Sequence, residues 1–260
     1  MRSTKLLSSV LFWLPTVLFI AAWEAGSRLL TSVPSAGKVA IALLDLLREK
    51  AVYAGIGQTL GRSIASFAVA ALVGIFFGAA IGAGGRFGDG FSALIDFLRS
   101  VPAPALLPVF MSLLGLYSGP KLMLAIFVCA LVNIVYVSYG IRRESRSLRA
   151  EMGRLFGAGR WFLFIHVVLP GAIESIIAGL RVTLSLALVL STLAELVLMT
   201  GGGAGVMIRI SYEDREEARM FALILMIGVV GYLLNRLFTV LESNITRIYA
   251  PTRRFGATLV

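Results

Sequence analysis

Long windows without a charged side chain are the feature that most limits what this 260-residue chain can fold into. A charged side chain at the centre of a bilayer costs about 2.5 to 3.5 kcal/mol on insertion scales, and about 20 helical residues cross the hydrocarbon core. Four windows of 18 to 23 residues lack Lys, Arg, Asp and Glu, and these are residues 6–23, 63–85, 100–120 and 122–141. We therefore expect an integral membrane protein with a transmembrane helix in each window.

Two further windows are interrupted by one charged residue each. Glu195 interrupts residues 182–203, and Arg236 lies near one end of residues 220–240. The composition agrees, because 58% of the residues are hydrophobic and 15% are charged, whereas soluble domains are about 45 to 50% apolar and about 25% charged. The sequence thus predicts an all-α membrane protein with six spans, forming a single transmembrane domain over residues 1–260.

The first window also resembles a secretory signal peptide, because a basic start precedes an apolar stretch. We favour a retained span. The stretch Leu6 to Trp23 is longer than the usual apolar region of a signal peptide, and no small-x-small cleavage pattern precedes Glu24.

The basic residues predict the orientation of the chain. With the N-terminus in the cytoplasm, 15 of the 24 lysines and arginines lie on the cytoplasmic side and 9 lie outside. This bias favours an orientation with both termini in the cytoplasm. The formal net charge of +10 is then a marker of topology and of contact with anionic lipid, and we predict no nucleic-acid partner.

Three segments outside the spans carry structural signals. Residues 39–47 have the apolar spacing of a short helix that lies at the membrane surface. Residues 211–219 form a charged outer loop, and the run Gly201 to Gly203 is predicted to be a flexible turn without a helix after it.

Catalytic constellations are sparse in this sequence. His166 is the only histidine and Cys129 the only cysteine, so neither a Ser-His mechanism nor a His-rich metal site has enough candidates. The dipeptide Gly37-Lys38 lacks the first glycine of a phosphate-binding loop, because position 32 is serine. We predict no metal, no cofactor and no enzymatic activity in the chain itself.

Polar and helix-breaking residues inside the predicted spans mark candidate pathway positions. Glu195 either lines a pathway, bonded to a polar neighbour such as Asn133, or makes a structural hydrogen bond between helices. Pro102, together with Pro104 and Pro108, breaks backbone hydrogen bonds at membrane depth and marks either a pathway border or a packed kink.

The loop of residues 141–170 is too long for a simple helical hairpin and carries six arginines. Residues 144–156 can be helical, Gly157 breaks this helix, and residues 160–168 can form a second short helix that ends before Pro170. We expect a helix-turn-helix elbow at the cytoplasmic surface, in which Leu169 and Pro170 fix the angle of the next span. Glu151 is expected to cap the turn or to pair with a nearby arginine.

This loop resembles the signature of ABC importer permeases, which runs E-A-A, three residues, G, nine residues, I, one residue, L-P. The chain reads Glu151-Met152-Gly153, three residues, Gly157, nine residues, then Val167-Val168-Leu169-Pro170. It departs from the pattern at the two alanines and at the isoleucine, while every spacing is kept. The resemblance implies a fold of the type I importer kind, with a coupling helix docked on a separate ATPase subunit.

The resemblance extends over roughly residues 34–241. Within the family, the sequence is most similar to the sulfonate, nitrate and taurine branch of these permeases. The similar segments are Leu98–Pro108, Gly115, Lys121, Ala194-Glu195 and Gly203-Ala204-Gly205. It implies a second permease copy, two ATPase subunits that bind ATP, and a periplasmic binding protein that delivers a small anion. The residues implied in coupling are Glu151, Gly157, Leu169 and Pro170. The alternative is a stand-alone ion-driven carrier or membrane enzyme, which the absence of a nucleophile-base pair and of an inverted repeat disfavours.

Overall fold

The computed structural model describes the backbone of residues 2–30, 32–115 and 118–249, and the side chains from residue 14 to residue 243 with gaps at 31 and 116–118. These residues form helices and no strand. The elements are α1 (Arg2–Leu29), α2 (Ala36–Leu46), α3 (Lys50–Ala83), α4 (Gly85–Arg99), the 3₁₀ helix η1 (Ala103–Leu106), α5 (Leu107–Leu114), α6 (Ser118–Ser145), α7 (Leu148–Leu155), α8 (Arg160–Leu163), the π-helix η2 (Phe164–Val168), α9 (Leu169–Leu198), α10 (Ala204–Glu213) and α11 (Glu217–Tyr249).

Four helices among the described residues are long and apolar enough to cross a membrane. They are α3, residues 119–145 of α6, the continuous helix of residues 160–198, and residues 217–243 of α11; the bent pair of α4 with η1 and α5 makes a fifth if it counts as one span. The predicted span at residues 6–23 lies within α1, but the side chains before Leu14 are outside the described residues. Six spans therefore stay a prediction, whereas the all-α membrane fold is confirmed.

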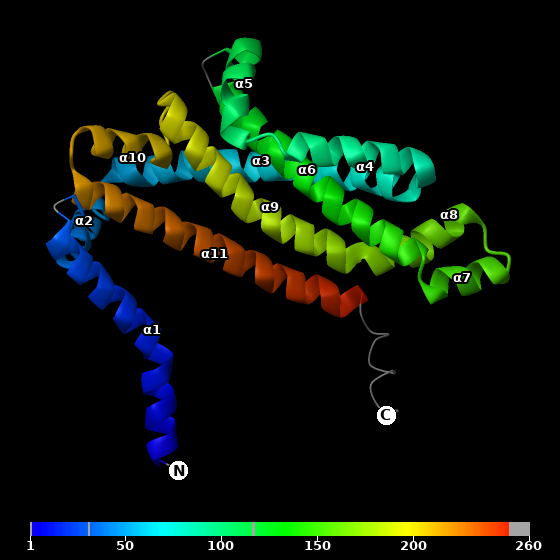
Figure 1. The fold of residues 1–260 in the computed structure, drawn as a ribbon, viewed down its shortest axis with the longest axis horizontal. Coiled ribbons are helices and arrows are strands. Elements are labelled where there is room, and N and C mark those ends of the chain that lie inside the picture. Colours follow the sequence, from blue (N-terminus) through cyan, green and yellow to red (C-terminus); the bar gives the residue numbers. More distant parts are fainter. Residues whose placement is uncertain (1, 31, 116–117, 250–260) are drawn as a thin grey trace.

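Helix α6 lies at the centre of the bundle, between α3 and α9 (Figure 1). Glycines at every fourth position of α3 face α6 and let the two backbones approach closely. A Cβ atom on Gly74 would lie 2.2 Å from Cβ of Asn133, and one on Gly78 would lie 2.6 Å from Cβ of Val137. Any larger residue at these two positions would push α3 away from α6.

The window of residues 100–120 does not form one straight helix. Helix α4 packs against α3 and α6, and α5 leaves it at an angle of 91°. The bend lies at Pro102, whose ψ is 122°, and α5 ends at Gly115, whose φ is +77°. Prolines donate no backbone hydrogen bond and disfavour the α conformation in the residue before them, so the helix cannot continue through this segment.

Helix α2 lies against α11 at the end of the bundle where α3 begins (Figure 1). Val39 and Leu46 of α2 are buried together with Val52, Ala222 and Leu223. The predicted short amphipathic helix is thus present and too short to cross, and its apolar face packs on another helix of the chain.

Glu49 and Arg219 join the start of α3 to the start of α11. The two guanidinium nitrogens Nη1 and Nη2 of Arg219 donate to the two carboxylate oxygens of Glu49 at 2.8 and 2.7 Å. These hydrogen bonds, and then the positive charge of Arg219, hold the pKa of Glu49 below its usual 4.5.

A lowered pKa in the folded state predicts a pH-dependent contribution to stability. The stabilisation of the folded state by the Glu49 carboxylate is fully present above the unfolded pKa of 4.5, and it is lost as the pH falls through the lower pKa of the folded state. Because the pair is partly exposed, we expect Glu49→Gln to cost about 0.5 to 1 kcal/mol at pH 7. Thermal unfolding in detergent from pH 7 to pH 3 should show this difference shrinking only below about pH 4.5. A difference that stays constant over the whole range would contradict the assignment.

Candidate functional site: an exposed elbow and a buried carboxylate

Helix α7 has a defined cap at each end. Ser147 accepts a hydrogen bond from the backbone N–H of Ala150 at 3.4 Å, as an N-cap residue does. At the other end Gly157 has φ +79°, its N–H bonds to the carbonyl of Arg154 at 3.0 Å, and the N–H of Ala158 bonds to the carbonyl of Gly153 at 2.9 Å. This pair of bonds is a Schellman motif, which favours glycine in the left-handed region. The chain turns at Gly157 as the sequence predicted, although one helix over residues 144–156 is wrong, because α6 continues to Ser145 and α7 begins only at Leu148.

Helices α7 and α8 pack through Gly153 and Leu163. A Cβ atom on Gly153 would lie 2.4 Å from Cδ2 of Leu163, whose side chain is buried. Glycine therefore permits close packing at a position where the family pattern has alanine.

The base of the elbow is held by Glu144, which sequence reasoning did not identify. Its carboxylate is buried, lies 3.6 Å from Arg149, and occupies the space beside Gly171 of α9. Arg154 also donates to the carbonyl of Ser145 at 2.5 Å. The burial of Glu144 depends on Gly171, a residue 27 positions later, so no local pattern could have shown it.

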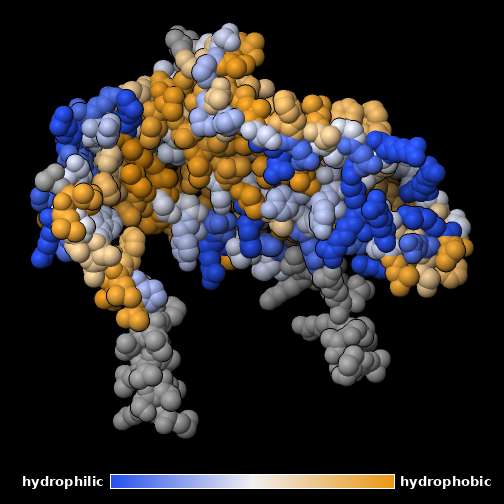
Figure 2. Space-filling model, in the orientation of Figure 1, coloured by the Kyte–Doolittle hydropathy of each residue, from blue (hydrophilic) through white to orange (hydrophobic). Residues whose placement is uncertain are grey.

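The outward face of the elbow is apolar. Leu155 is 83% exposed, Phe156 85% and Trp161 78%, and Figure 2 shows hydrophobic surface at this end of the molecule next to hydrophilic surface. The other exposed apolar residues of the elbow are Leu148, Met152, Phe162 and Ile165. Exposed apolar surface of this extent between arginines is typical of an interaction site.

Glu151 lies exposed in the first turn of α7. None of the ion pairs among the described residues includes it, so the predicted pairing with a nearby arginine does not occur, and the cap of the turn is formed by the backbone at Gly157 instead. A carboxylate in the first turn still interacts favourably with the helix dipole.

Leu169 and Pro170 lie inside a continuous helix, so the prediction of a helix end before Pro170 is wrong. Residues 160–198 run as one helix, with a single π-turn over Phe164–Val168. The N–H of Leu169 bonds to the carbonyl of Phe164, five residues back. Proline cannot donate to the carbonyl four residues before it, and the wider π-turn accommodates its ring. The elbow is therefore joined rigidly to α9.

Glu195 is fully buried at the end of the bundle opposite the elbow. Its Oε1 accepts from Nε of Arg62 at 2.9 Å and lies 2.7 Å from Nη2 of the same guanidinium. Its Oε2 accepts from the hydroxyl of Thr59 at 2.8 Å and from the backbone N–H of Gly205 at 2.9 Å. Both oxygens are thus satisfied, and the carboxylate joins α3, α9 and the start of α10.

The glycine run leads directly into a helix, contrary to the prediction that none follows it. Gly201, Gly202 and Gly203 all have positive φ, and α10 begins at Ala204. A Cβ atom on Gly203 would lie 2.4 Å from the Glu195 carboxylate. The carboxylate of Glu195 therefore caps the N-terminus of α10, and its negative charge interacts favourably with the positive end of the helix dipole.

Asn133 is not the partner of Glu195, and that prediction is wrong. Its carbonyl oxygen accepts from the hydroxyl of Thr183 at 3.2 Å, and its amide donates to the carbonyl of Ala70 at 3.5 Å. Thr183 and Glu195 are twelve residues apart on α9, which is about 18 Å along a helix. Asn133, which bonds to Thr183, thus lies at a different depth of the bundle from Glu195.

Lys121 is 1% exposed, although its charge suggested a position outside the membrane. Its ammonium donates to the carbonyl of Thr200, and Arg62 donates from Nη2 to the carbonyl of Gly202 at 2.7 Å. The sequence marked Lys121 as a position similar to the family, but it predicted neither of these contacts, since the two residues lie 79 and 140 positions from their acceptors.

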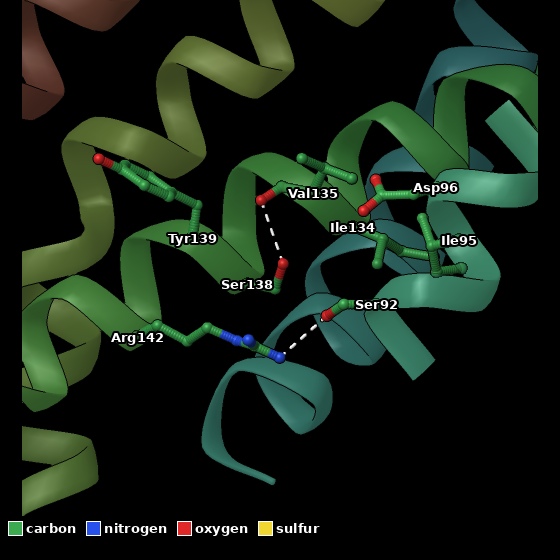
Figure 3. A pocket seen from close by; sticks show the side chains of 8 residues that line it. All are labelled: Ser92, Ile95, Asp96, Ile134, Val135, Ser138, Tyr139 and Arg142. Carbon is green, nitrogen blue, oxygen red and sulfur yellow. Dashed lines mark hydrogen bonds between the residues drawn. The ribbon is translucent and has the colours of Figure 1, made fainter. Parts of the chain in front are cut away.

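A cavity of about 170 Å³ lies between α4 and α6 (Figure 3). Arg142 lines it, donating to Asp89 at 2.6 Å and to Ser92 at 2.9 Å. These bonds fasten α4 to the elbow end of α6. Across the described residues, no group of three His, Cys, Asp or Glu side chains has the proximity of metal ligands.

Residues 70–247 match the model of a family described as binding-protein-dependent transport system inner membrane component. The nitrate import permease protein NrtB of Synechocystis is 28% identical over 75% of this chain and 70% of its own. The bicarbonate transport system permease protein CmpB of Synechococcus elongatus is 26% identical over 73% of this chain and 68% of its own. The putative aliphatic sulfonates transport permease protein SsuC of Escherichia coli is 38% identical over 42% of this chain and 41% of its own.

A solved structure of inward-facing conformations of the MetNI methionine ABC transporter has the same fold. It covers 76% of this chain and 95% of its own, with a TM-score of 0.64 and 18% identity. An amino acid ABC transporter covers 75% of this chain and 92% of its own, with a TM-score of 0.55 and 19% identity. The fold is thus that of type I importer permeases.

Proposed function

This chain belongs to the family of inner membrane components of binding-protein-dependent transport systems, and on that premise we propose that its elbow couples it to an ATPase and that its cargo is a small monovalent oxyanion. It is a permease component of an ABC importer in the inner membrane, without an ATPase site of its own. ATP hydrolysis is the task of a partner subunit, and a soluble binding protein is the other implied partner.

The exposed apolar face of the elbow is the observation that carries the coupling proposal. Leu155 and Phe156 stand almost fully exposed at a tip whose arginines favour the cytoplasmic side. Burial of such side chains contributes about 1.5 to 3 kcal/mol each, which is enough to make them the centre of a docking site. The alternative, a purely lipid-bound basic patch, does not explain the defined caps that hold α7.

The rigidity of the elbow supports a mechanical role. Gly153 packs tightly against Leu163 of α8, and α8 continues through Pro170 into α9 without a break. A displacement of α7 by an ATPase dimer would therefore move α9 as a lever. In our proposal, the contact with the ATPase is made by Phe156 and its apolar neighbours. The shape of the lever depends on Glu151, Gly157, Leu169 and Pro170.

The names of the relatives support the choice of cargo. Nitrate, bicarbonate and aliphatic sulfonates, which those relatives are named for, are oxyanions with a single negative charge near neutral pH. Taurine shares the sulfonate group and belongs to the same proposal. We place delivery by a periplasmic binding protein at the end of the bundle opposite the elbow, with both termini in the cytoplasm and a second permease copy completing the pathway.

Charge placed on the elbow tip tests this function. In Leu155→Asp/Phe156→Asp both changed side chains are more than 80% exposed, so the fold should be kept while docking is lost. We expect the ATPase subunit recovered with the tagged permease to fall at least about tenfold, the equivalent of 1.4 kcal/mol. ATP-dependent uptake in proteoliposomes should fall with it.

Tyr212→Asp is the matched control, because Tyr212 is 62% exposed on α10 at the opposite end of the bundle. It should recover as much ATPase as the wild type. Normal ATPase recovery by the double variant would contradict docking at the elbow. Uptake by the purified chain alone, without ATP, would instead favour the stand-alone carrier.

A further inference from the structure

Two cations and one carboxylate meet where α3, α6 and the loop after α9 converge. Arg62 pairs with Glu195 and donates to the carbonyl of Gly202. Lys121 donates to the carbonyl of Thr200, two residues earlier in the same loop. With all three ionised, the group carries one net positive charge among largely buried side chains. Removing an uncompensated charge from water costs several kcal/mol, so a stable arrangement requires a counter-charge or many hydrogen bonds.

The hydrogen bonds of this group are incomplete on the Lys121 side. An ammonium has three N–H donors, and the only acceptor found for Lys121 among the described residues is the carbonyl of Thr200. The hydroxyl of Thr200 is buried as well, and no hydrogen-bond partner for it lies within the part of the chain that the structure describes. The Glu195 carboxylate cannot supply the missing acceptor, because four donors already saturate it.

The loop after α9 offers the two cations only uncharged acceptors, which are backbone carbonyls. Arg62 binds the carbonyl of Gly202 and Lys121 that of Thr200, and both carbonyls belong to the same short segment. Positive φ angles occur at Met199 before this segment, at Gly201 and Gly202 within it, and at Gly203 after it. The glycines of the segment tolerate many backbone conformations, so the carbonyls can be exchanged for another acceptor at low cost.

We propose that Lys121, Arg62 and the Thr200 hydroxyl form a subsite for one small monovalent oxyanion. The proposal deepens the function proposed above and rests on it for the biological cargo. An incoming anion replaces the carbonyls of residues 200 and 202, accepts from the ammonium, the guanidinium and the hydroxyl, and cancels the single excess charge. Access is from the side of the loop, where the Arg62 side chain keeps 12% exposure and Gly202 is exposed. A dianion would leave an excess negative charge and should bind less well.

The test uses the purified full-length permease in detergent, without ATPase or binding protein. Sodium nitrate or sodium ethanesulfonate is titrated at constant ionic strength against sodium gluconate, and the apparent melting temperature is followed. A ligand that binds only the folded state raises this temperature in a saturable manner. We expect Lys121→Met to weaken the apparent affinity at least about tenfold, because the charge-assisted hydrogen bonds are lost. Lys121→Arg should retain the response.

Lys38→Met is the matched control, since Lys38 is exposed on α2, and it should respond as the wild type does. If Lys121→Met does not fold, Thr200→Val serves instead and should weaken the affinity several-fold. Sodium sulfate should give a smaller response than nitrate. A saturable response of full size in Lys121→Met or in Thr200→Val, or no anion response in the wild type, would overturn the subsite. Because no ATPase is present, failure here is separate from failure of ATPase recovery in the elbow experiment.

Discussion

Replacing Glu195 with alanine is expected to lower the free energy of unfolding by about 3 to 5 kcal/mol, because it breaks a buried ion pair by removing one partner. The substitution leaves the guanidinium of Arg62 without its counter-charge at a side chain that is 12% exposed. It also leaves the Gly205 N–H without its carboxylate acceptor and removes the shorter of the two hydrogen bonds of the Thr59 hydroxyl, which keeps the carbonyl of Gly55 at 3.2 Å. An unpartnered buried polar group costs about 1 to 3 kcal/mol, so these losses reinforce one another.

Unfolding of the purified protein in mixed micelles with increasing SDS provides the measurement. Glu49→Gln is the matched control, because Glu49 also pairs with an arginine but lies partly exposed, and its loss should cost no more than about 1 kcal/mol.

A double-mutant cycle separates the ion pair from the packing. Arg62→Met combined with Glu195→Ala removes both charges, so the double variant should lose less stability than the sum of the single variants by about 1 to 3 kcal/mol. Strict additivity would mean that Arg62 and Glu195 do not stabilise each other, and would contradict the ion pair as the connection between α3 and α9.

Replacing Gly157 with valine is expected to decouple the permease from its ATPase while the chain still inserts. Gly157 has φ +79°, and a β-branched residue in the left-handed region costs about 1 to 2 kcal/mol. No atom lies within 4 Å of the position of a Cβ there, so the strain is conformational and not steric. It should open the Schellman turn and tilt α7 away from α8.

Gly159→Val is the matched control for this change. Gly159 also has open space around its Cβ position, but its φ of −64° and ψ of 153° suit valine. We expect Gly157→Val to reduce ATPase recovery about tenfold at equal membrane expression, whereas Gly159→Val should leave it unchanged. Equal recovery by both variants would show that the turn at Gly157 does not position the docking face.

The elbow was largely predictable because its signals are local. The cap residue Ser147, the break at Gly157 and the following helix lie within a few residues of one another, and a helix end is governed by hydrogen bonds over four or five residues. The prediction failed at three points. The helix expected over residues 144–156 is divided between α6 and α7, and Glu151 pairs with none of the nearby arginines among the described residues. A π-turn that ends two residues before Pro170 lets the second helix pass through this proline.

The buried carboxylate could be located but its partners could not be identified. A single acid in an apolar window predicts a buried and bonded side chain, and Glu195 is both. Its partner is Arg62, 133 residues away on α3, a helix that begins at Lys50 and therefore well before the charge-free window of residues 63–85. The polar side chain of Asn133 made it the predicted partner, yet Asn133 lies at another depth of the bundle and bonds to Thr183.

The sequence by itself determined that this protein lies in a lipid bilayer, that it is helical, and that it has an elbow between two spans. The signals for these features are the charge-free windows, the bias of the basic residues and the turn residues, and each of them acts over a short stretch of chain. Only the tertiary structure decided that Lys121 is buried, that the glycines after α9 start a helix closed by Glu195, and that α4 and α5 meet at a sharp bend. The physical reason is that a buried charge is tolerated only beside specific partners. Those partners come from helices far apart in the chain, and packing alone brings them together.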